Sequence, residues 1–234
     1  MEAFGRLPLR FERIEGRATE QPSYLARGTG YTVFVLPAEM VLWLRSANGR
    51  TAVLRVRLLG ARSPVEIEGL DELPGSSNYF IGGDPKRWRK NVPGHAKVRC
   101  RGVYPGIGVV YYGRQGKLEF DFVVQPGSDP DRIRLGFEGA RGLRLDHERS
   151  LLVLAEGGEV KLHTPRVYQN VGWKESTVPG RWVLSGADEA RFEVGAYDRG
   201  LPLVIDPVLD YSTYLGGSAS DEGHSIAVDG SGSV

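Results

Sequence analysis

Two carboxylates, Glu119 and Asp121, stand two residues apart in a run that alternates between polar and apolar residues. This spacing places both on one face of a β-strand, opposite Leu118, Phe120 and Phe122. A pair of carboxyl groups can perform glycoside hydrolysis, with one group as the acid and the other as base or nucleophile. The same spacing also arises on any strand with a solvated face. We therefore expect a half-buried strand, and we keep a glycosidase-type enzyme as the less favoured interpretation.

Other residue types that carry out chemistry lack the spacing that it requires. The four histidines are His95, His147, His163 and His224. They contain no H-x-x-x-H pair, and no Gly-x-Ser-x-Gly elbow occurs. Gly106, Gly108 and Gly113 are not spaced as a phosphate loop, and a strand pattern follows them instead of a helix. We therefore expect no catalytic residue, no cofactor and no metal centre.

Acidic turns are the remaining candidates for a metal ion. Residues 129–131 are Asp-Pro-Asp, and residues 229–233 are Asp-Gly-Ser-Gly-Ser; Asp, Gly and Ser can ligate calcium. Neither run follows the calcium-loop pattern D-x-[DN]-x-[DN]-G. Asx-turns between strands are the simpler interpretation, and calcium stays open.

Aromatic side chains offer a candidate binding surface. Trp173 lies in the polar run 172–177, and Tyr79 and Trp88 lie in a stretch rich in turn residues. Most aromatics of a globular domain fill its core, but exposed ones can stack on a sugar ring. Trp173, Tyr79 and Trp88 are therefore the candidate ligand-binding residues, with a carbohydrate-binding module as the alternative function.

Composition narrows the class of protein. Apolar residues make up 41% of the 234 residues, as in an ordinary globular protein, and the net charge is only +1. A nearly neutral chain has no overall field for a polyanion, so no nucleic-acid partner is expected. Cys100 is the single cysteine, which predicts a buried apolar side chain and excludes an internal disulfide. No apolar run is long enough to span a membrane, and no signal peptide is visible.

Short apolar runs separated by turn residues every eight to twelve positions predict an all-β fold. We expect it to be sandwich-like and built from two packed halves, 1–95 and 96–207. Runs at 31–36 and 40–44 predict a hairpin around Pro37-Ala38-Glu39. The run at 51–59 predicts a strand with Leu54, Val56 and Leu58 on its core face. Further strands are expected at 96–100, 107–113, 117–124 and in eight short runs between 133 and 205. Residues 69–95 predict an irregular loop held on the core by its aromatics.

The C-terminal residues differ from the rest in their pattern. Leu209-Asp-Tyr-Ser-Thr-Tyr-Leu-Gly-Gly-Ser218, followed by Asp221, Gly223 and Ile226-Ala-Val-Asp-Gly-Ser-Gly, resembles the start of an SBBP repeat, the unit of seven-bladed β-propellers. The resemblance covers residues 208–234, so this segment is expected to be a truncated first propeller repeat. A break at Asp206-Pro207 is the natural boundary before it.

Upstream, several stretches resemble the uncharacterised domain that precedes such repeats in bacterial surface and secreted proteins. They include Tyr24-Leu-Ala-Arg-Gly-Thr-Gly-Tyr-Thr32, Asn78-Tyr-Phe-Ile-Gly82, Val103-Tyr-Pro-Gly-Ile107, Leu118-Glu-Phe-Asp-Phe122 and Leu203-Val-Ile-Asp-Pro207. The sequence departs from that domain at Gly108, where an acidic residue is common. The resemblance implies an extracellular or cell-surface location, although the missing signal peptide by itself favours the cytoplasm.

These observations favour a non-catalytic N-terminal module of a bacterial surface or secreted propeller protein, with a role in assembly, anchoring or partner binding. The expected partners are the downstream propeller blades, together with surface glycans or proteins. An exposed row of aromatics would favour the carbohydrate-binding alternative. A cleft with a second carboxylate across from Glu119 would favour the enzyme.

Overall fold

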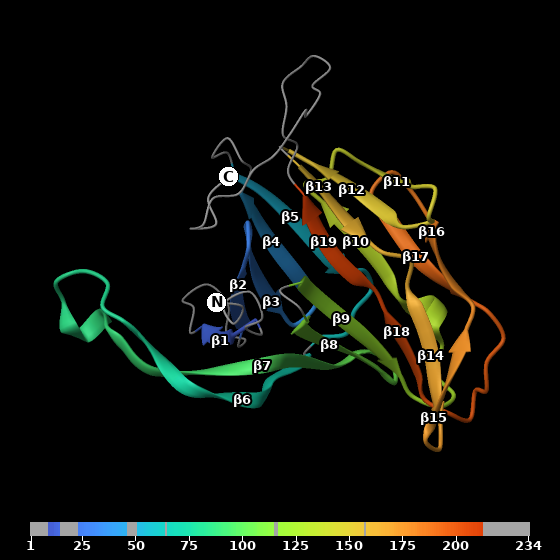
Figure 1. The fold of residues 1–234 in the computed structure, drawn as a ribbon, viewed down its shortest axis with the longest axis horizontal. Helices are drawn as coiled ribbons and strands as arrows, with labels where there is room; N and C mark the ends of the chain where they lie inside the picture. The colour runs from blue at the N-terminus through green and yellow to red at the C-terminus, as the bar shows by residue number, and fades with distance from the viewer. Residues whose placement is uncertain are drawn as a thin grey trace, which may run out of the picture.

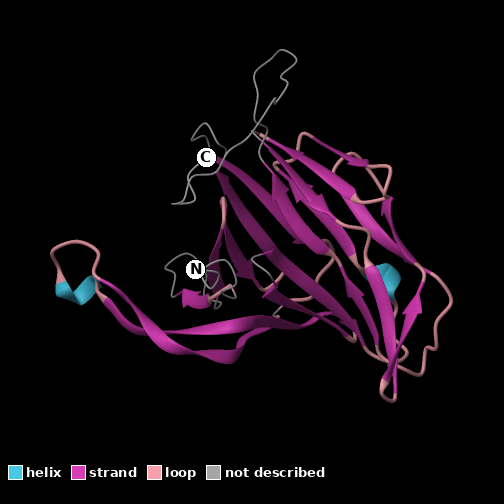
Figure 2. Ribbon diagram, in the orientation of Figure 1, coloured by secondary structure: helices cyan, strands magenta, loops and turns pink. Residues whose placement is uncertain are grey.

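A computed structural model describes residues 9–14, 23–45, 51–63, 65–114, 117–156 and 158–212. Nearly all of their regular structure is β-strand, and two short 3₁₀ turns are the only helices in these ranges (Figure 2). The all-β prediction is therefore confirmed.

The strands follow one another closely along the chain (Figure 1). The first nine are β1 (Phe11–Ile14), β2 (Ser23–Gly28), β3 (Tyr31–Leu36), β4 (Glu39–Arg45), β5 (Thr51–Leu58), β6 (Glu66–Tyr79), β7 (Arg89–Tyr104), β8 (Ile107–Arg114) and β9 (Lys117–Val124). The next ten are β10 (Arg134–Glu138), β11 (Gly142–Leu145), β12 (Leu151–Ala155), β13 (Gly158–Leu162), β14 (Arg166–Val171), β15 (Lys174–Val178), β16 (Gly180–Leu184), β17 (Glu189–Val194), β18 (Leu203–Asp206) and β19 (Val208–Ser212). The 3₁₀ turns are η2 (Pro85–Arg87) and η3 (Pro130–Arg132).

All of these strands belong to one antiparallel sheet. One wall runs in the order β16–β17–β10–β5–β4–β3–β2–β1, and β1 pairs with β7, which leads through β8 to β9. At β9 the sheet forks, because β18 pairs with its last residues and β19 with its first. β18 continues into β14 and β15, whereas β19 continues into β13, β12 and β11. β11 lies close to β16, so the sheet curls until it nearly closes on itself (Figure 1).

Alternating side chains explain why these runs form strands. In β3 the residues Tyr31, Val33 and Val35 point inward and are buried, and the residues between them are only partly covered. In β5 the inward residues are Leu54, Val56 and Leu58, as predicted, while Val53 on the outer face is 47% exposed. The turn at Pro37-Ala38 joins β3 to β4, which confirms the predicted hairpin.

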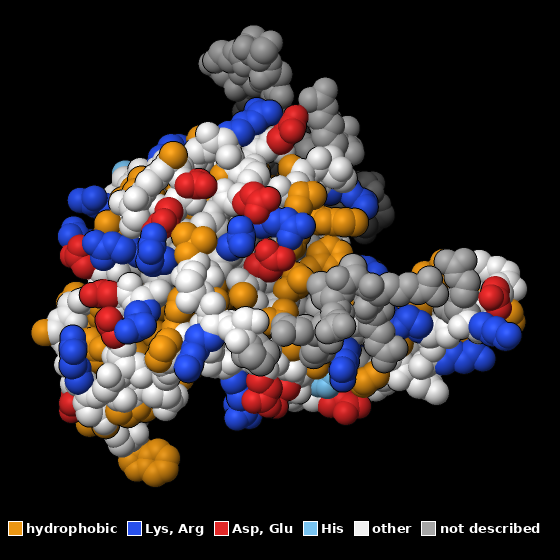
Figure 3. All heavy atoms as spheres, turned by 180° about the vertical axis from the view of Figure 1, so that it is seen from behind, with side chains coloured by type: hydrophobic (Ala, Val, Ile, Leu, Met, Phe, Trp, Pro, Cys, Tyr) orange, Lys and Arg blue, Asp and Glu red, His pale blue; other side chains and the backbone are white. Residues whose placement is uncertain are grey.

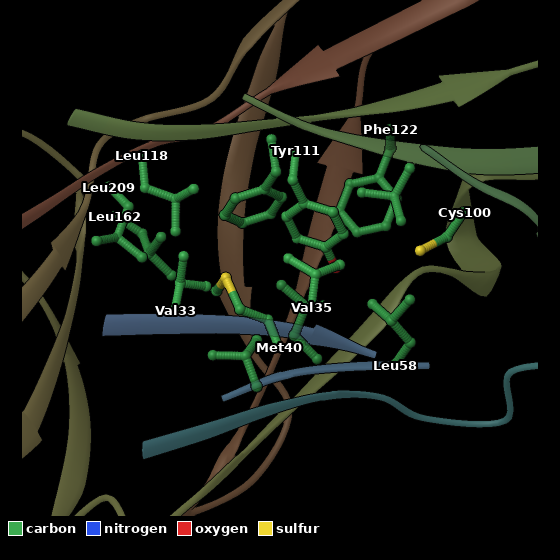
Figure 4. Close-up of a cluster of buried hydrophobic side chains, with 14 of the residues drawn as sticks. Val33, Val35, Met40, Leu58, Cys100, Tyr111, Leu118, Phe122, Leu162 and Leu209 are labelled. Atoms are coloured by element: carbon green, nitrogen blue, oxygen red, sulfur yellow. The ribbon is translucent and has the colours of Figure 1, made fainter. Parts of the chain in front are cut away.

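The curled sheet encloses a single core (Figure 4). Leu118, Phe120 and Phe122 are all buried in it, as the alternation in β9 predicts. Phe122 lies 5.7 Å from Phe192 of β17 between ring centroids, and Phe192 lies 4.3 Å from Trp182 of β16. These aromatic contacts join two walls that are distant in the sheet order, so they hold the curled sheet together across its interior. Cys100 is fully buried, also as predicted, and burial raises the pKa of its thiol to about 12.

The expected division into two packed halves is not what the sheet shows. The boundary between residues 95 and 96 falls inside β7, which runs without interruption from residue 89 to residue 104. Hydrogen-bonded pairing continues from strand to strand on both sides of this boundary. The buried residues form one core cluster that extends from Leu9 to Leu209 in the sequence. One continuous sheet replaces the two halves because β7, with 16 residues, is almost three times as long as a typical strand and pairs with β6, β8 and β1.

The expected start of the propeller repeat at residue 208 also lies within this sheet. Residues 208–212 form β19, which pairs with β13 and β9, and Leu209 is buried. Pro207 separates β18 from β19 without ending the fold. The remainder of the expected repeat, residues 213–234, lies outside the described residues.

The prediction of an irregular loop over residues 69–95 is wrong. These residues form most of β6 and the beginning of β7, a long hairpin that ends in the turn at η2. Turn-forming residues are tolerated because the ladder is irregular there: its register shifts between Leu73 and Ser76, at Pro74-Gly75. Asp71 and Asn91 have φ of 54° and 55°, the left-handed conformation that these two residue types accept most readily.

Candidate functional site

The distal half of the β6–β7 hairpin projects away from the rest of the molecule (Figure 1). We call residues 71–93 the arm, because within the described part of the chain the pairing of these residues is only between β6 and β7. The pairing of β7 with β8 ends at Lys97, and that with β1 ends at Gly94. A hairpin of two strands is marginal in water on its own, so the arm needs further contacts at its root.

A buried carboxylate supplies those contacts. Glu12 of β1 is 6% exposed and accepts hydrogen bonds from the hydroxyls of Ser77 and Tyr79 and from Nε of Arg10 at 3.3 Å. Burial alone would raise the pKa of Glu12, but these three donors outweigh it and hold the pKa below its usual value. Glu12 therefore ties the arm to the body as an ionised acceptor.

Arginines reinforce the attachment. One nitrogen of Arg10 donates to the carbonyl of Gly75 at 2.8 Å, and Arg89 donates to the carbonyl of Arg13 at 2.6 Å. Arg27 of β2 donates to the Tyr79 hydroxyl at 3.3 Å and lies 5.9 Å from its ring centroid. Tyr79, expected to be a ligand-binding aromatic, is thus occupied in anchoring the arm.

The end of the arm carries aromatic and basic side chains. We call residues 80–90 the arm tip, and within it Phe80 is 61% exposed and Ile81 is 68% exposed. Trp88 contacts Phe80 edge to face at 5.2 Å, and its indole nitrogen donates to the carbonyl of Gly82 at 3.1 Å. Lys90 Nζ lies 5.5 Å from the Trp88 centroid. Trp88 therefore organises the tip and carries a cation against its ring.

Trp173, the third expected ligand-binding aromatic, stands apart from the other two. It occupies the turn between β14 and β15 and is fully exposed. That hairpin and the arm lie at opposite ends of the molecule in Figure 1. The structure therefore brings Tyr79 and Trp88 together in the arm but does not join them to Trp173 in one platform.

A second cluster of titratable groups lies on the outer face of β8, β9 and β18. Glu119 was expected on a solvated face but is 5% exposed, because β9 is paired on both edges and neighbouring side chains cover it. Asp206 of β18 is also buried, and the Tyr112 hydroxyl donates to Asp121 at 3.0 Å. Glu119 Oε2 and Asp206 Oδ1 are buried without a hydrogen-bond partner. Burial, and next the charge of Asp206, raise the pKa of Asp121 to about 7.

Shallow recesses occur elsewhere on the surface. One of about 290 Å³ lies at the ends of β2–β4, lined by Arg27, Tyr31 and Trp43 among others. Another of about 310 Å³ lies beside β7 and β8, lined by Arg99, Arg101 and Gly108 among others. Arg99 and Arg101 both contact Glu68, each at 2.7 Å through Nε, which satisfies much of their charge. Neither recess includes Glu119 or Asp121.

Few metal-binding features appear in the ranges that the structure covers. No group of three or more His, Cys, Asp or Glu residues is arranged to hold a metal ion among them. Asp129 accepts a hydrogen bond from the Asp131 amide at 3.1 Å and begins η3, so the predicted Asx-turn is confirmed there. Residues 229–233 lie outside the described part. No helix in the described residues has the length and apolarity to cross a membrane.

Comparison with known proteins identifies the domain by its sequence. Residues 11–208 match the family described as a domain of unknown function, DUF7948. The chain belongs to this family. The match begins at the first residue of β1 and ends at the first residue of β19, so it spans the whole described sheet apart from the end of β19. No curated protein and no solved structure matches the chain.

Sequence reasoning missed the features of the DUF7948 domain that depend on the arm. Phe80 and Ile81 were not singled out, nor was Glu12. The sequence does contain a sign of an exposed segment here: the apolar pair Phe80-Ile81 is followed closely by the basic run at 86–90. A loop that merely plugs a core has no need for four basic residues in five.

Glu12→Gln should loosen the arm of the DUF7948 domain without unfolding its body. The NH2 group that replaces one carboxylate oxygen cannot accept a hydrogen bond, so Ser77 or Tyr79 loses its acceptor and the other hydroxyl keeps only an uncharged one. Hydrogen bonds to a charged group contribute about 1.5–3 kcal/mol. Amide hydrogen exchange at 76–79 and 89–92 should therefore quicken roughly 10- to 100-fold, with β8 and β9 unchanged.

Glu138→Gln is the matched control for this exchange experiment, because Glu138 makes only an exposed pair with Arg57 at 4.0 Å. It should leave the exchange of the arm unaltered. Unchanged exchange of the arm in Glu12→Gln would show that the carboxylate does not anchor it.

Asp121→Asn should stabilise the DUF7948 domain at pH 8 and change its stability little at pH 4. The pKa of Asp121 is raised in the folded state, so the folded protein binds more protons than the unfolded chain between about pH 4 and 7. Stability from this group therefore falls as pH rises through that window. An asparagine does not titrate and should recover roughly 1–3 kcal/mol at pH 8. Urea melts at the two pH values measure the difference.

Asp210→Asn should change the stability of the domain in the opposite direction. Burial alone would raise the pKa of Asp210, but Lys117 at 2.9 Å and His163 at 2.7 Å outweigh it and lower the pKa. This substitution should therefore destabilise the domain at neutral pH. Equal effects of Asp121→Asn at pH 4 and pH 8 would contradict the assignment.

Proposed function

We propose that the DUF7948 domain is a non-catalytic binding or anchoring module that acts through its β6–β7 arm. The observation that carries this proposal is the arm itself: a hairpin that is held to β1 through Ser77 and Tyr79 and that presents exposed Phe80 and Ile81 next to these contacts. Exposed apolar groups held on an ordered support are typical of interaction sites, because they contribute nothing to the core. The anchoring through Glu12 keeps the tip at a constant distance from the body.

The carboxyl pair offers less support for an enzyme. Glu119 and Asp121 lie on the same strand, and Glu119 is covered, whereas a hydrolase needs two carboxyl groups on either side of an open cleft. The raised pKa of Asp121 has a structural cause in burial beside Asp206. The carbohydrate-binding alternative is weakened in turn by the roles of Tyr79 and Trp88 in organising the arm.

The proposed setting is a bacterial surface or secreted protein in which the domain precedes SBBP propeller repeats. Support comes from the resemblance of residues 208–234 to the start of such a repeat. In this arrangement β19 would lead directly from the sheet into the first blade. The arm projects from a different part of the molecule than β19, so the two could engage different partners at once (Figure 1).

Site-specific photocrosslinking in the host cell tests the binding role. A photoreactive amino acid replaces Ile81 in the full-length protein, and another replaces Val53, which is similarly exposed on the body. Crosslinked products that form from position 81 and not from position 53 would support the proposal. The same products from both positions, or none from position 81, would overturn it.

A further inference from the structure

The arm tip combines a fixed frame with an exposed apolar end. Asp84 accepts a hydrogen bond from the Lys86 amide at 3.0 Å, and the Trp88 amide donates to the carbonyl of Pro85 at 3.2 Å. The indole of Trp88 closes the loop onto Gly82, which has a φ of 75°. Because these contacts hold the loop, Phe80 and Ile81 stay exposed instead of folding back on the hairpin.

Basic groups surround the apolar end. The sequence from 79 to 91 contains Lys86, Arg87, Arg89 and Lys90 against a single acid, Asp84. Lys86 and Lys90 are exposed and make no ion pair within the described residues. Figure 3, in which the arm projects to the right, shows Lys and Arg side chains gathered towards its end. The tip is therefore locally cationic on a domain that is nearly neutral, which predicts an anionic partner.

The shape of the tip favours the surface of a lipid bilayer as the partner, over a groove in a protein or a nucleic acid. Phe80 and Ile81 are exposed at the start of the tip loop. The hairpin that carries this loop projects from the body (Figure 1), so both side chains can enter a bilayer interface while the body stays outside. Base stacking would need open aromatic faces, but Lys90 lies against both Trp88 and Phe80, at 5.5 and 6.0 Å. Aromatic and aliphatic side chains among lysines are the composition that binds anionic lipid interfaces.

We propose that the arm tip docks on the surface of a membrane that contains anionic lipid. This inference rests on the binding role of the arm and names its partner. Phe80 and Ile81 enter the interfacial region, and Lys86 and Lys90 contact lipid phosphates. Each basic residue close to such a surface strengthens binding about fivefold, an effect that salt weakens.

Vesicle co-sedimentation of the full chain tests the inference. The vesicles consist of phosphatidylcholine alone or of phosphatidylcholine mixed with phosphatidylglycerol, each at low and high salt. The tip variant is Phe80→Ser with Ile81→Ser and Lys90→Gln. The control variant is Trp173→Ser with Lys174→Gln, which removes an exposed aromatic and a lysine from the other projecting hairpin. Both variants change exposed residues, and their thermal melts should match that of the unmodified chain.

We expect the unmodified chain and the control variant to bind the anionic vesicles, more weakly at high salt, and to bind neutral vesicles poorly. The tip variant should lose at least about tenfold in binding, since it lacks both the apolar insertion and one cation. No binding to anionic vesicles, or an equal loss in both variants, would overturn the inference. A crosslink from position 81 to a protein or a glycan, without vesicle binding, would also overturn it while leaving the binding role of the arm intact.

Discussion

A chain that ends at Pro207 should be much less stable than one that ends at Ser212. The shorter chain loses β19, which pairs with four residues of β13 and with the start of β9. It also loses Leu209, which is 2% exposed, and removal of one buried leucine side chain alone costs roughly 2–5 kcal/mol. Since domains of this kind are stable by only about 5–15 kcal/mol, the shorter chain should be close to unfolded at ordinary temperature.

Denaturant melts of three chains measure this effect. The chain ending at Ser212 should unfold as cooperatively as the full 234 residues, because the described sheet is then complete. The chain ending at Pro207 should show a transition at far lower denaturant or none. Equal midpoints for the chains ending at 207 and 212 would place the domain boundary before β19.

The local strand pattern could be predicted from the sequence where one face of a strand is buried. The inward positions of β5 and of β9 are all in the core, as the alternating residues predict. Such predictions succeed because alternation is a property of neighbouring residues, and burial of one face decides it.

Other features depend on partners that are distant in sequence, so no local pattern indicates them. The fork at β9 requires β18 and β19 to pair with two halves of one strand edge. The arm requires Glu12, 65 residues away from Ser77, to stabilise a hairpin whose own residues are rich in turn formers. The burial of Glu119 likewise follows from the paired edges of β9. In this curled sheet the sequence therefore predicts individual strands but not which strands pair.

The aromatic contacts across the interior connect these distant parts, and Phe122 is at their centre. Its ring is fully buried, 5.9 Å from Phe120 and 5.7 Å from Phe192 between centroids. Phe120 belongs to the same strand, whereas Phe192 belongs to the opposite wall. Loss of this ring therefore removes contacts within β9 and across the core together.

Phe122→Ala should destabilise the domain by roughly 3–5 kcal/mol, because it removes a buried aromatic ring and leaves a cavity that the two walls cannot fully close. Phe34→Ala is the matched control: Phe34 contacts Trp43 at 5.2 Å but lies on the outer face of β3 and is only partly covered. The control should cost less than half as much, since solvent already reaches its ring. Urea melts at a single pH give both values. A loss below about 1 kcal/mol for Phe122→Ala would mean that the two walls are not held together through this ring.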